Sequence, residues 1–207
     1  MKQIILLTLL LSSCIAVAQT PKLDPAKSEA SRFQSVVPKA RWERIFFQAI
    51  NERARIAKLP TLRSALPKDD LELRIWHGFG LTALEGFVLR RSSGKWSAIH
   101  LDGIHSKLAR KDYQKELPVP KSGWDECWRK LVEMEILTLP DAYEIECSTY
   151  LHDGFSYVVE INHESTYRTY LYDNPSYAKC EQAKRMISIG NFIADEFDVR
   201  EMATIKQ

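Results

Sequence analysis

The stretch that decides the fold is FSYVVEINHESTYRTYLY, residues 155–172. Apolar and polar side chains alternate along it on both sides of a short polar interruption, His163–Ser165. Alternation with a period of two residues predicts two β-strands, Phe155–Asn162 and Thr166–Tyr172. Because a short turn cannot connect parallel strands, we expect this pair to be antiparallel.

The sequence around this pair completes a helix–strand–strand–strand–helix order. Upstream lies a third predicted strand, Tyr143–Leu151, followed by the hairpin turn Asp153-Gly154. Downstream, Asp173-Asn174-Pro175 ends the last strand and precedes a helix predicted over Ser176–Phe197. A further amphipathic helix opens this half, because apolar residues recur at helical spacing at Trp124, Cys127, Trp128, Leu131 and Val132.

The first half of the chain repeats much of this order. Its helix is predicted from Arg41 to about Lys58, with Trp42, Ile45, Phe46, Ala49 and Ile50 on one face. Three predicted strands follow: Leu71–Trp76, Thr82–Arg91 and Lys95–Leu101. The middle strand is apolar at both alternating sets of positions, which is typical of a central strand that is covered on both faces.

The two halves can be aligned, which suggests a diverged duplication. Trp42 and Phe46 correspond to Trp124 and Trp128, and each helix is followed by Leu-Pro. The alternative is a chance likeness between two amphipathic helices. The sequence therefore predicts an α+β protein of two sequential helix-plus-three-stranded antiparallel units, residues 39–103 and 122–207, with a C-terminal helix and a linker over 104–121.

The first 18 residues have the features of a secretory signal peptide: Lys2, an apolar run and small residues at Ala16-Val17-Ala18. Cleavage before Gln19 is one interpretation. Leu11-Ser12-Ser13-Cys14 also resembles a bacterial lipobox, in which Cys14 would be lipidated. Residues 19–38, which contain three prolines, are predicted to be a flexible tether. We expect an exported protein, either periplasmic or secreted, or anchored to the membrane as a lipoprotein.

Charge and motifs exclude several classes of function. With 29 basic and 27 acidic residues in 207, the formal charge of +2 argues against a nucleic-acid-binding protein in which charge dominates. The chain contains none of the patterns G-x-S-x-G, H-E-x-x-H, G-x-x-x-x-G-K-[ST], G-x-G-x-x-G and C-x-x-C. We therefore expect no catalytic site, no metal and no cofactor, and no membrane contact other than through a lipid anchor.

Three of the four cysteines lie outside the signal: Cys127, Cys147 and Cys180. Each is expected to point inwards, and an oxidising compartment favours one disulfide among them. Sequence alone does not separate the three pairings. Cys147–Cys180 is favoured because the last helix has to cover the sheet that carries Cys147. Three inert buried thiols are the alternative.

The expected binding site is the outer face of the second sheet. Alternation places tyrosines, glutamates and an arginine there, and Tyr and Arg are enriched at binding hot spots. An ordinary solvated face with a Glu160–Arg168 pair is the plainer interpretation. The residues assigned to binding are Tyr150, Glu160, Arg168, Tyr170 and Tyr172.

These patterns predict a non-catalytic binding module of the bacterial envelope, whose partner is a protein or another envelope component. The alternative is an envelope hydrolase, assisted by a metal, built on His100, Asp102 and His105 at the end of a strand. The spacing of these three residues matches no closed metal-site motif, and an Asp-Gly turn explains Asp102 equally well.

Overall fold

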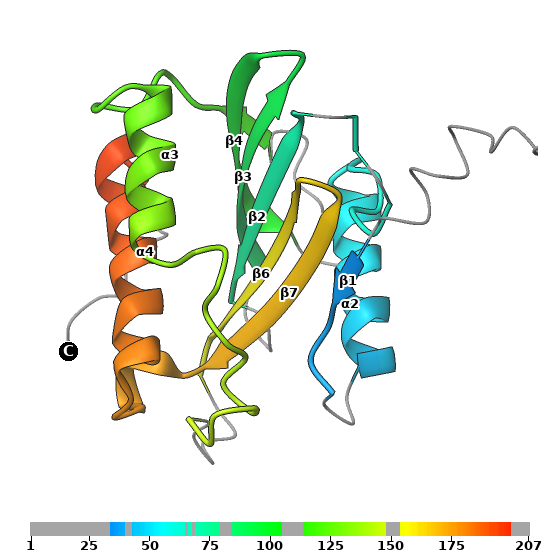
Figure 1. Ribbon diagram of the computed structural model, residues 1–207, viewed down its shortest axis with the longest axis vertical. Coiled ribbons are helices and arrows are strands. Elements are labelled where there is room, and N and C mark those ends of the chain that lie inside the picture. The colour runs from blue at the N-terminus through cyan, green and yellow to red at the C-terminus, as the bar shows by residue number, and fades with distance from the viewer. Residues whose placement is uncertain are drawn as a thin grey trace, which may run out of the picture. The chain divides into compact units, whose positions relative to one another are not determined.

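A seven-stranded sheet forms the centre of the computed structural model, in the order β1-β7-β6-β2-β3-β4-β5 (Figure 1). The strands are β1 (Gln34–Val36), β2 (Leu71–His77), β3 (Leu84–Ser92), β4 (Lys95–Ile104), β5 (Gln114–Glu116), β6 (Ser156–His163) and β7 (Thr166–Asp173). β1 pairs with β7 in parallel, and the other pairs are antiparallel. The structure describes residues 34–39, 43–64, 66–67, 69–78, 84–104, 114–147 and 154–199.

Helices cover both faces of the sheet. Helices α3 (Trp124–Glu133) and α4 (Glu181–Phe197) lie side by side on one face, and α2 (Glu43–Ile56) lies on the other (Figure 1). A short 3₁₀ helix, η1 (Pro175–Tyr177), precedes α4. Each face has its own apolar core: Phe87 and Ile189 belong to the core under α3 and α4, whereas Phe46 and Trp76 belong to the core under α2. The fold is therefore α+β with a mixed sheet.

Five of the predicted strands are present as β2, β3, β4, β6 and β7. The prediction of a central strand covered on both faces is also confirmed, because β3 pairs with β2 on one side and with β4 on the other. Its Phe87 packs towards α3 and α4, and the adjacent Val88 packs towards α2. Neither side chain is more than 3% exposed, as expected for a strand with apolar residues at both alternating sets of positions.

The duplicated two-unit layout is not confirmed, because the two halves share one sheet. Strand β2 of the first half pairs with β6 of the second, with Ile75 opposite Val159. Two separate three-stranded sheets would each expose edge strands with unpaired backbone groups. Joining the sheets along β2 and β6 satisfies these groups and extends each apolar core across the junction.

Three segments differ from expectation. Tyr143–Cys147 forms a turn region rather than a strand, with Glu146 at a positive φ of 53°, and residues 148–151 of that predicted strand lie outside the described residues. Gln34–Val36, inside the predicted tether, forms β1. Gln114–Glu116, inside the predicted linker, forms β5. Both short strands pair at the outer edges of the sheet, where tertiary contacts rather than a local apolar pattern decide the conformation.

Candidate functional site

The face predicted to bind a partner is not exposed. Glu160, Tyr170 and Tyr172 are at most 2% exposed, and Arg168 is half-buried. Tyr150 lies outside the described residues. The prediction of an open Tyr/Glu/Arg surface is therefore wrong for Glu160, Tyr170 and Tyr172, whereas Arg168 is only partly covered.

Strand register explains this correction. Glu160 is directly opposite Thr169, so it points to the same face as Tyr167 and away from Arg168. Tyr170 belongs to the core under α3 and α4, whereas Tyr167 belongs to the core under α2. The expected Glu160–Arg168 pair does not form, because the two side chains lie on opposite faces of the sheet.

The strap, residues 134–147, covers Arg168, Tyr170 and Tyr172. It connects the end of α3 to the disulfide and crosses β7. The hydroxyl of Tyr170 donates to the carbonyl of Ile136 at 2.9 Å, and that of Tyr172 donates to the carbonyl of Pro140 at 2.7 Å. These buried hydroxyls therefore hold the strap and are not available to a partner.

Asp141 fixes the middle of the strap. One carboxylate oxygen accepts from the backbone N–H of Leu171 at 2.8 Å, and the other accepts from that of Tyr143 at 2.9 Å. Asp141 is only 2% exposed. Burial raises the pKa of Asp141 to about 6, although the two N–H donors oppose the shift.

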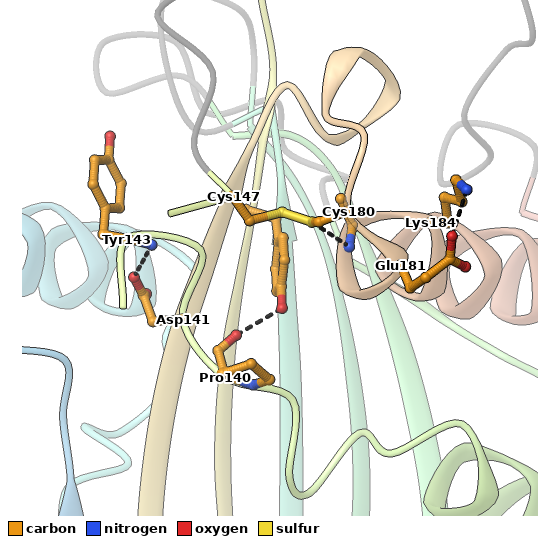
Figure 2. The surroundings of a disulfide bond; sticks show 9 residues. Pro140, Asp141, Tyr143, Cys147, Cys180, Glu181 and Lys184 are labelled. Carbon is orange, nitrogen blue, oxygen red and sulfur yellow. Dashed lines mark hydrogen bonds and ion pairs between the residues drawn. A yellow bond between two sulfur atoms is a disulfide. The ribbon is translucent and has the colours of Figure 1, made fainter. Parts of the chain in front are cut away.

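A disulfide between Cys147 and Cys180 anchors the far end of the strap, as Figure 2 shows. The Cα atoms are 5.9 Å apart, and 33 positions separate the cysteines in the sequence. Cys180 is the N-cap of α4, and its sulfur accepts from the backbone N–H of Ala183. The predicted pairing is confirmed, although Cys147 lies in the strap and not in a strand.

A cavity of about 160 Å³ opens where the strap meets the end of the β6–β7 hairpin. We call it the hairpin pocket, and its lining residues are Leu137, Ile161, His163, Glu164, Thr166 and Arg168. Leu137 comes from the strap and the other five from β6, β7 and the turn between them. The strap thus supplies one wall of the pocket, and the hairpin supplies the rest.

The turn at the rim of the pocket is tight. His163 pairs with Thr166, so only Glu164 and Ser165 connect β6 to β7. Both have positive φ values, 50° and 63°, as required of a two-residue turn that matches the twist of the strands. This turn sets the register of the hairpin and places His163, Thr166 and Arg168 around one opening.

Arg168 is the only basic side chain that is permanently charged among the residues lining the pocket. Its Nη2 donates to the carbonyl of Leu139 at 2.6 Å, and a longer contact of 3.4 Å joins it to that of Thr138. Its Nε is buried without a hydrogen-bond partner. No carboxylate of the residues described here forms an ion pair with Arg168. The strap carbonyls orient the guanidinium without neutralising it.

His163 and Glu164 flank Arg168 at the opening. The imidazole packs against Trp128 with the ring centroids 5.9 Å apart, and its Nε2 lies 3.7 Å from a carboxylate oxygen of Glu164. Burial lowers the pKa of His163, with Arg91 adding to the shift and Glu164 opposing it. Glu164 itself is 82% exposed, so its charge is largely screened by water.

The residues of the hydrolase alternative are not shown to form a site. His100 is buried, at 6% exposed, and Asp102 is exposed, whereas His105 lies outside the described residues. Within the described ranges, no group of three or more His, Cys, Asp or Glu residues is arranged to hold a metal ion. His77 and Glu85 do approach each other, with 3.7 Å between Nδ1 and a carboxylate oxygen.

Cys127 has the properties of a core residue rather than of a nucleophile. It is fully buried on α3, and it is the free cysteine among the described residues. Burial, together with the negative charge of Glu196, raises the pKa of its thiol to about 12. A thiol with this pKa is protonated at neutral pH and is therefore unreactive.

Comparison with known proteins adds no assignment, because no protein-family model and no curated protein matches this sequence. None of the described helices is long and apolar enough to cross a membrane. The hairpin pocket is therefore judged on its own geometry and charge.

Sequence reasoning found one pocket residue, Arg168, and missed the others. Glu164-Ser165 is not one of the Asn-Gly or Asp-Gly pairs that identify a two-residue hairpin turn, so no local signal indicated it. Leu137 is 24 positions before Ile161, the nearest other pocket residue in the sequence, and no local pattern indicates that the strap returns to the hairpin.

Proposed function

We propose that this chain is an exported binding module of the bacterial envelope, without catalytic activity, which holds part of a protein or envelope partner in the hairpin pocket. The observation that carries the proposal is Arg168, a half-buried cation that lines a cavity of about 160 Å³ and has no ion-pair partner among the described residues. Buried or half-buried charges in proteins are normally paired, so an unpaired one beside an open pocket suits a ligand.

Two further features support export and rigidity. The N-terminal residues 1–18 carry the pattern of a signal peptide, with Cys14 as the alternative site of lipidation. The Cys147–Cys180 disulfide suits an oxidising compartment outside the cytosol. It also holds the strap in place, which favours a preformed pocket that loses little conformational entropy when a ligand binds.

A capture experiment with a filled pocket tests the binding function. Leu137 is a half-buried wall residue, so Leu137→Trp is expected to occupy the cavity while the Arg168 charge stays. Val119, which is 63% exposed and does not line the pocket, provides the matched control Val119→Trp. Wild type and the control should retain the same component from envelope extracts, and Leu137→Trp should not. Equal retention by all three proteins would show that the pocket is not the binding site.

A further inference from the structure

The chemistry of the hairpin pocket narrows the class of ligand. Arg168 supplies one full positive charge. Its guanidinium is held by carbonyls of Leu139 and Thr138, which accept hydrogen bonds but carry no net charge. The guanidinium has five N–H donors, of which the two carbonyls use only those of Nη2. A carboxylate is a suitable acceptor for the remaining charged donors. The unpaired charge of Arg168 therefore suits an anionic ligand.

The remaining lining residues favour a single negative charge. No second permanent cation lines the pocket, and burial lowers the pKa of His163, which disfavours the charged form of its imidazole. Glu164 adds a negative charge at the rim. Either anion would face the one cation, Arg168, and the exposed carboxylate of Glu164, so a dianionic phosphate leaves more negative charge uncompensated than a monoanionic carboxylate does.

The size and walls of the pocket indicate what the carboxylate is attached to. Ile161, which is 2% exposed, and Leu137 provide apolar walls. For comparison, an engineered cavity of about 150 Å³ holds a benzene molecule. The hairpin pocket, at about 160 Å³, thus has room for a carboxylate together with a short aliphatic chain.

We infer that the hairpin pocket binds a carboxylate on a short aliphatic chain, with Arg168 on the carboxylate and Ile161 and Leu137 on the chain. This inference rests on the proposed binding function and names its ligand chemistry. A glutamate side chain and the C-terminal residue of a polypeptide both carry this group. Thr166 also lines the pocket.

The test is a titration monitored by ¹H–¹⁵N NMR, with the Arg168 Nε–H and the amides of residues 161–168 as reporters. One pair of probes tests a side-chain carboxylate: the α-amide of N-acetylglutamate and, as its matched amide, the α-amide of N-acetylglutamine. A second pair tests a chain-end carboxylate: N-acetylleucine and its amide. Inorganic phosphate is the fifth probe. The two carboxylates should shift these reporters in a saturable manner, and their matched amides should not. The carboxylate that binds more tightly shows whether the natural ligand presents a glutamate side chain or the C-terminal residue of a polypeptide.

Variants separate the role of Arg168 from a general loss of fold. Arg168→Gln should weaken binding of the better carboxylate roughly ten-fold or more, as expected for hydrogen bonds to a charged group. Arg168→Lys should weaken it less, since the charge stays but the planar guanidinium and its additional N–H donors are lost. Arg129→Gln is the control, because Arg129 pairs with Glu126 and Glu133 on the surface of α3. Leu137→Trp should abolish binding with the charge intact.

Four results would overturn the inference. They are no saturable shift with either carboxylate, matched amides that bind as tightly as the acids, phosphate that binds more tightly than either carboxylate, and an Arg168→Gln variant that is folded and binds as wild type does. These results are distinct from a failure of the proposed function. A partner that is captured by wild type and lost by Leu137→Trp, combined with no carboxylate binding, keeps the binding function and rejects the ligand class.

Discussion

Two arginines lie on opposite faces of the sheet, and they differ in whether a carboxylate pairs with them. Arg74, on β2, is 1% exposed and faces α2. Its Nε donates to Glu72 at 2.7 Å, and its Nη2 donates to the carbonyl of Pro60 at 2.8 Å. Arg168, on β7, faces the strap and donates to carbonyls alone. The protein neutralises one cation internally and leaves the other charged beside a pocket.

The surroundings of Arg74 show what a closed site requires. Glu160, directly opposite Arg74 across β2 and β6, accepts from the indole N–H of Trp76 and from the hydroxyl of Tyr167. Burial raises the pKa of Glu160, and the positive charge of Arg74 opposes that shift. Glu72 also accepts from Arg90. The charges of this network are paired with one another inside the fold. We therefore infer that the network stabilises the fold rather than binds a ligand.

The largest effect is expected from breaking this closed network. Arg74→Met leaves Glu160 buried without its counter-charge and leaves Glu72 paired with Arg90 alone. Removing one partner of a buried ion pair destabilises a protein by about 3–5 kcal/mol. The free energy of unfolding, measured by urea denaturation, should fall by that amount. In the double variant Arg74→Met/Glu160→Gln, part of the loss should return, because one buried carboxylate is gone. A loss below about 1 kcal/mol for Arg74→Met would mean that the network is not buried as described.

The next effect concerns the strap. The variant Cys147→Ser/Cys180→Ser removes the disulfide that closes a long loop, which is expected to reduce the free energy of unfolding by about 2–4 kcal/mol. The strap remains bonded to β7 through Tyr170, Tyr172 and Asp141, so the protein should still fold. Urea denaturation with and without a reductant measures the effect. Cys127→Ser is the control for the remaining thiol, and a wild type insensitive to reductant would contradict the prediction.

A smaller effect should depend on pH through Asp141. Its pKa is about 6 in the folded state, above the ordinary value of 3.8, so the folded protein binds this proton more tightly than the unfolded chain does. The contribution of Asp141 to the free energy of unfolding is present below about pH 4 and decreases as pH rises to about 6, by at most about 3 kcal/mol.

Other carboxylates titrate in the same pH range, so the effect of Asp141 has to be measured as the difference in the free energy of unfolding between two proteins. The free energy of unfolding of wild type and of Asp141→Asn is compared at several pH values from 4 to 7. The wild type should lose stability relative to the variant as pH rises. Parallel pH profiles would show that Asp141 titrates in the folded state as it does in the unfolded chain.

The smallest change in stability is expected for Arg168→Gln. The hydrogen bond from Arg168 to the carbonyl of Leu139 contributes on the order of 1 kcal/mol, and the glutamine amide can donate in its place. The midpoint of urea denaturation should therefore stay close to that of wild type. A loss as large as that of Arg74→Met would remove the contrast between the two arginines and make Arg168 a structural residue.

Much of the local structure was predictable from particular residues. Alternation identified β2, β3, β4, β6 and β7, and helical spacing identified α2 and α3. The pairing of Cys147 with Cys180 was also correct. By contrast, Tyr143–Cys147 has the alternation of a strand but forms a turn, because Asp141 accepts the backbone N–H of Tyr143. A carboxylate bond of this kind competes locally with strand pairing, and alternation cannot reveal it.

The sequence by itself determined three helices and five of the seven strands that the structure describes, and that the chain could close a disulfide, since periodicity and composition act over a few neighbouring residues. It did not indicate β1 or β5, and it predicted a strand where Tyr143–Cys147 forms a turn. Only the tertiary structure decided which face each side chain occupies. Alternation divides the side chains of a strand into two sets but does not say which set lies on which face of the sheet. The pairing of Glu160 with Thr169 places both on the face that also carries Tyr167, and it places Arg168 on the other face. The same register, together with the strap, buried Tyr170 and Tyr172 and left Arg168 at the pocket, because long-range packing and not local pattern chooses what covers a sheet.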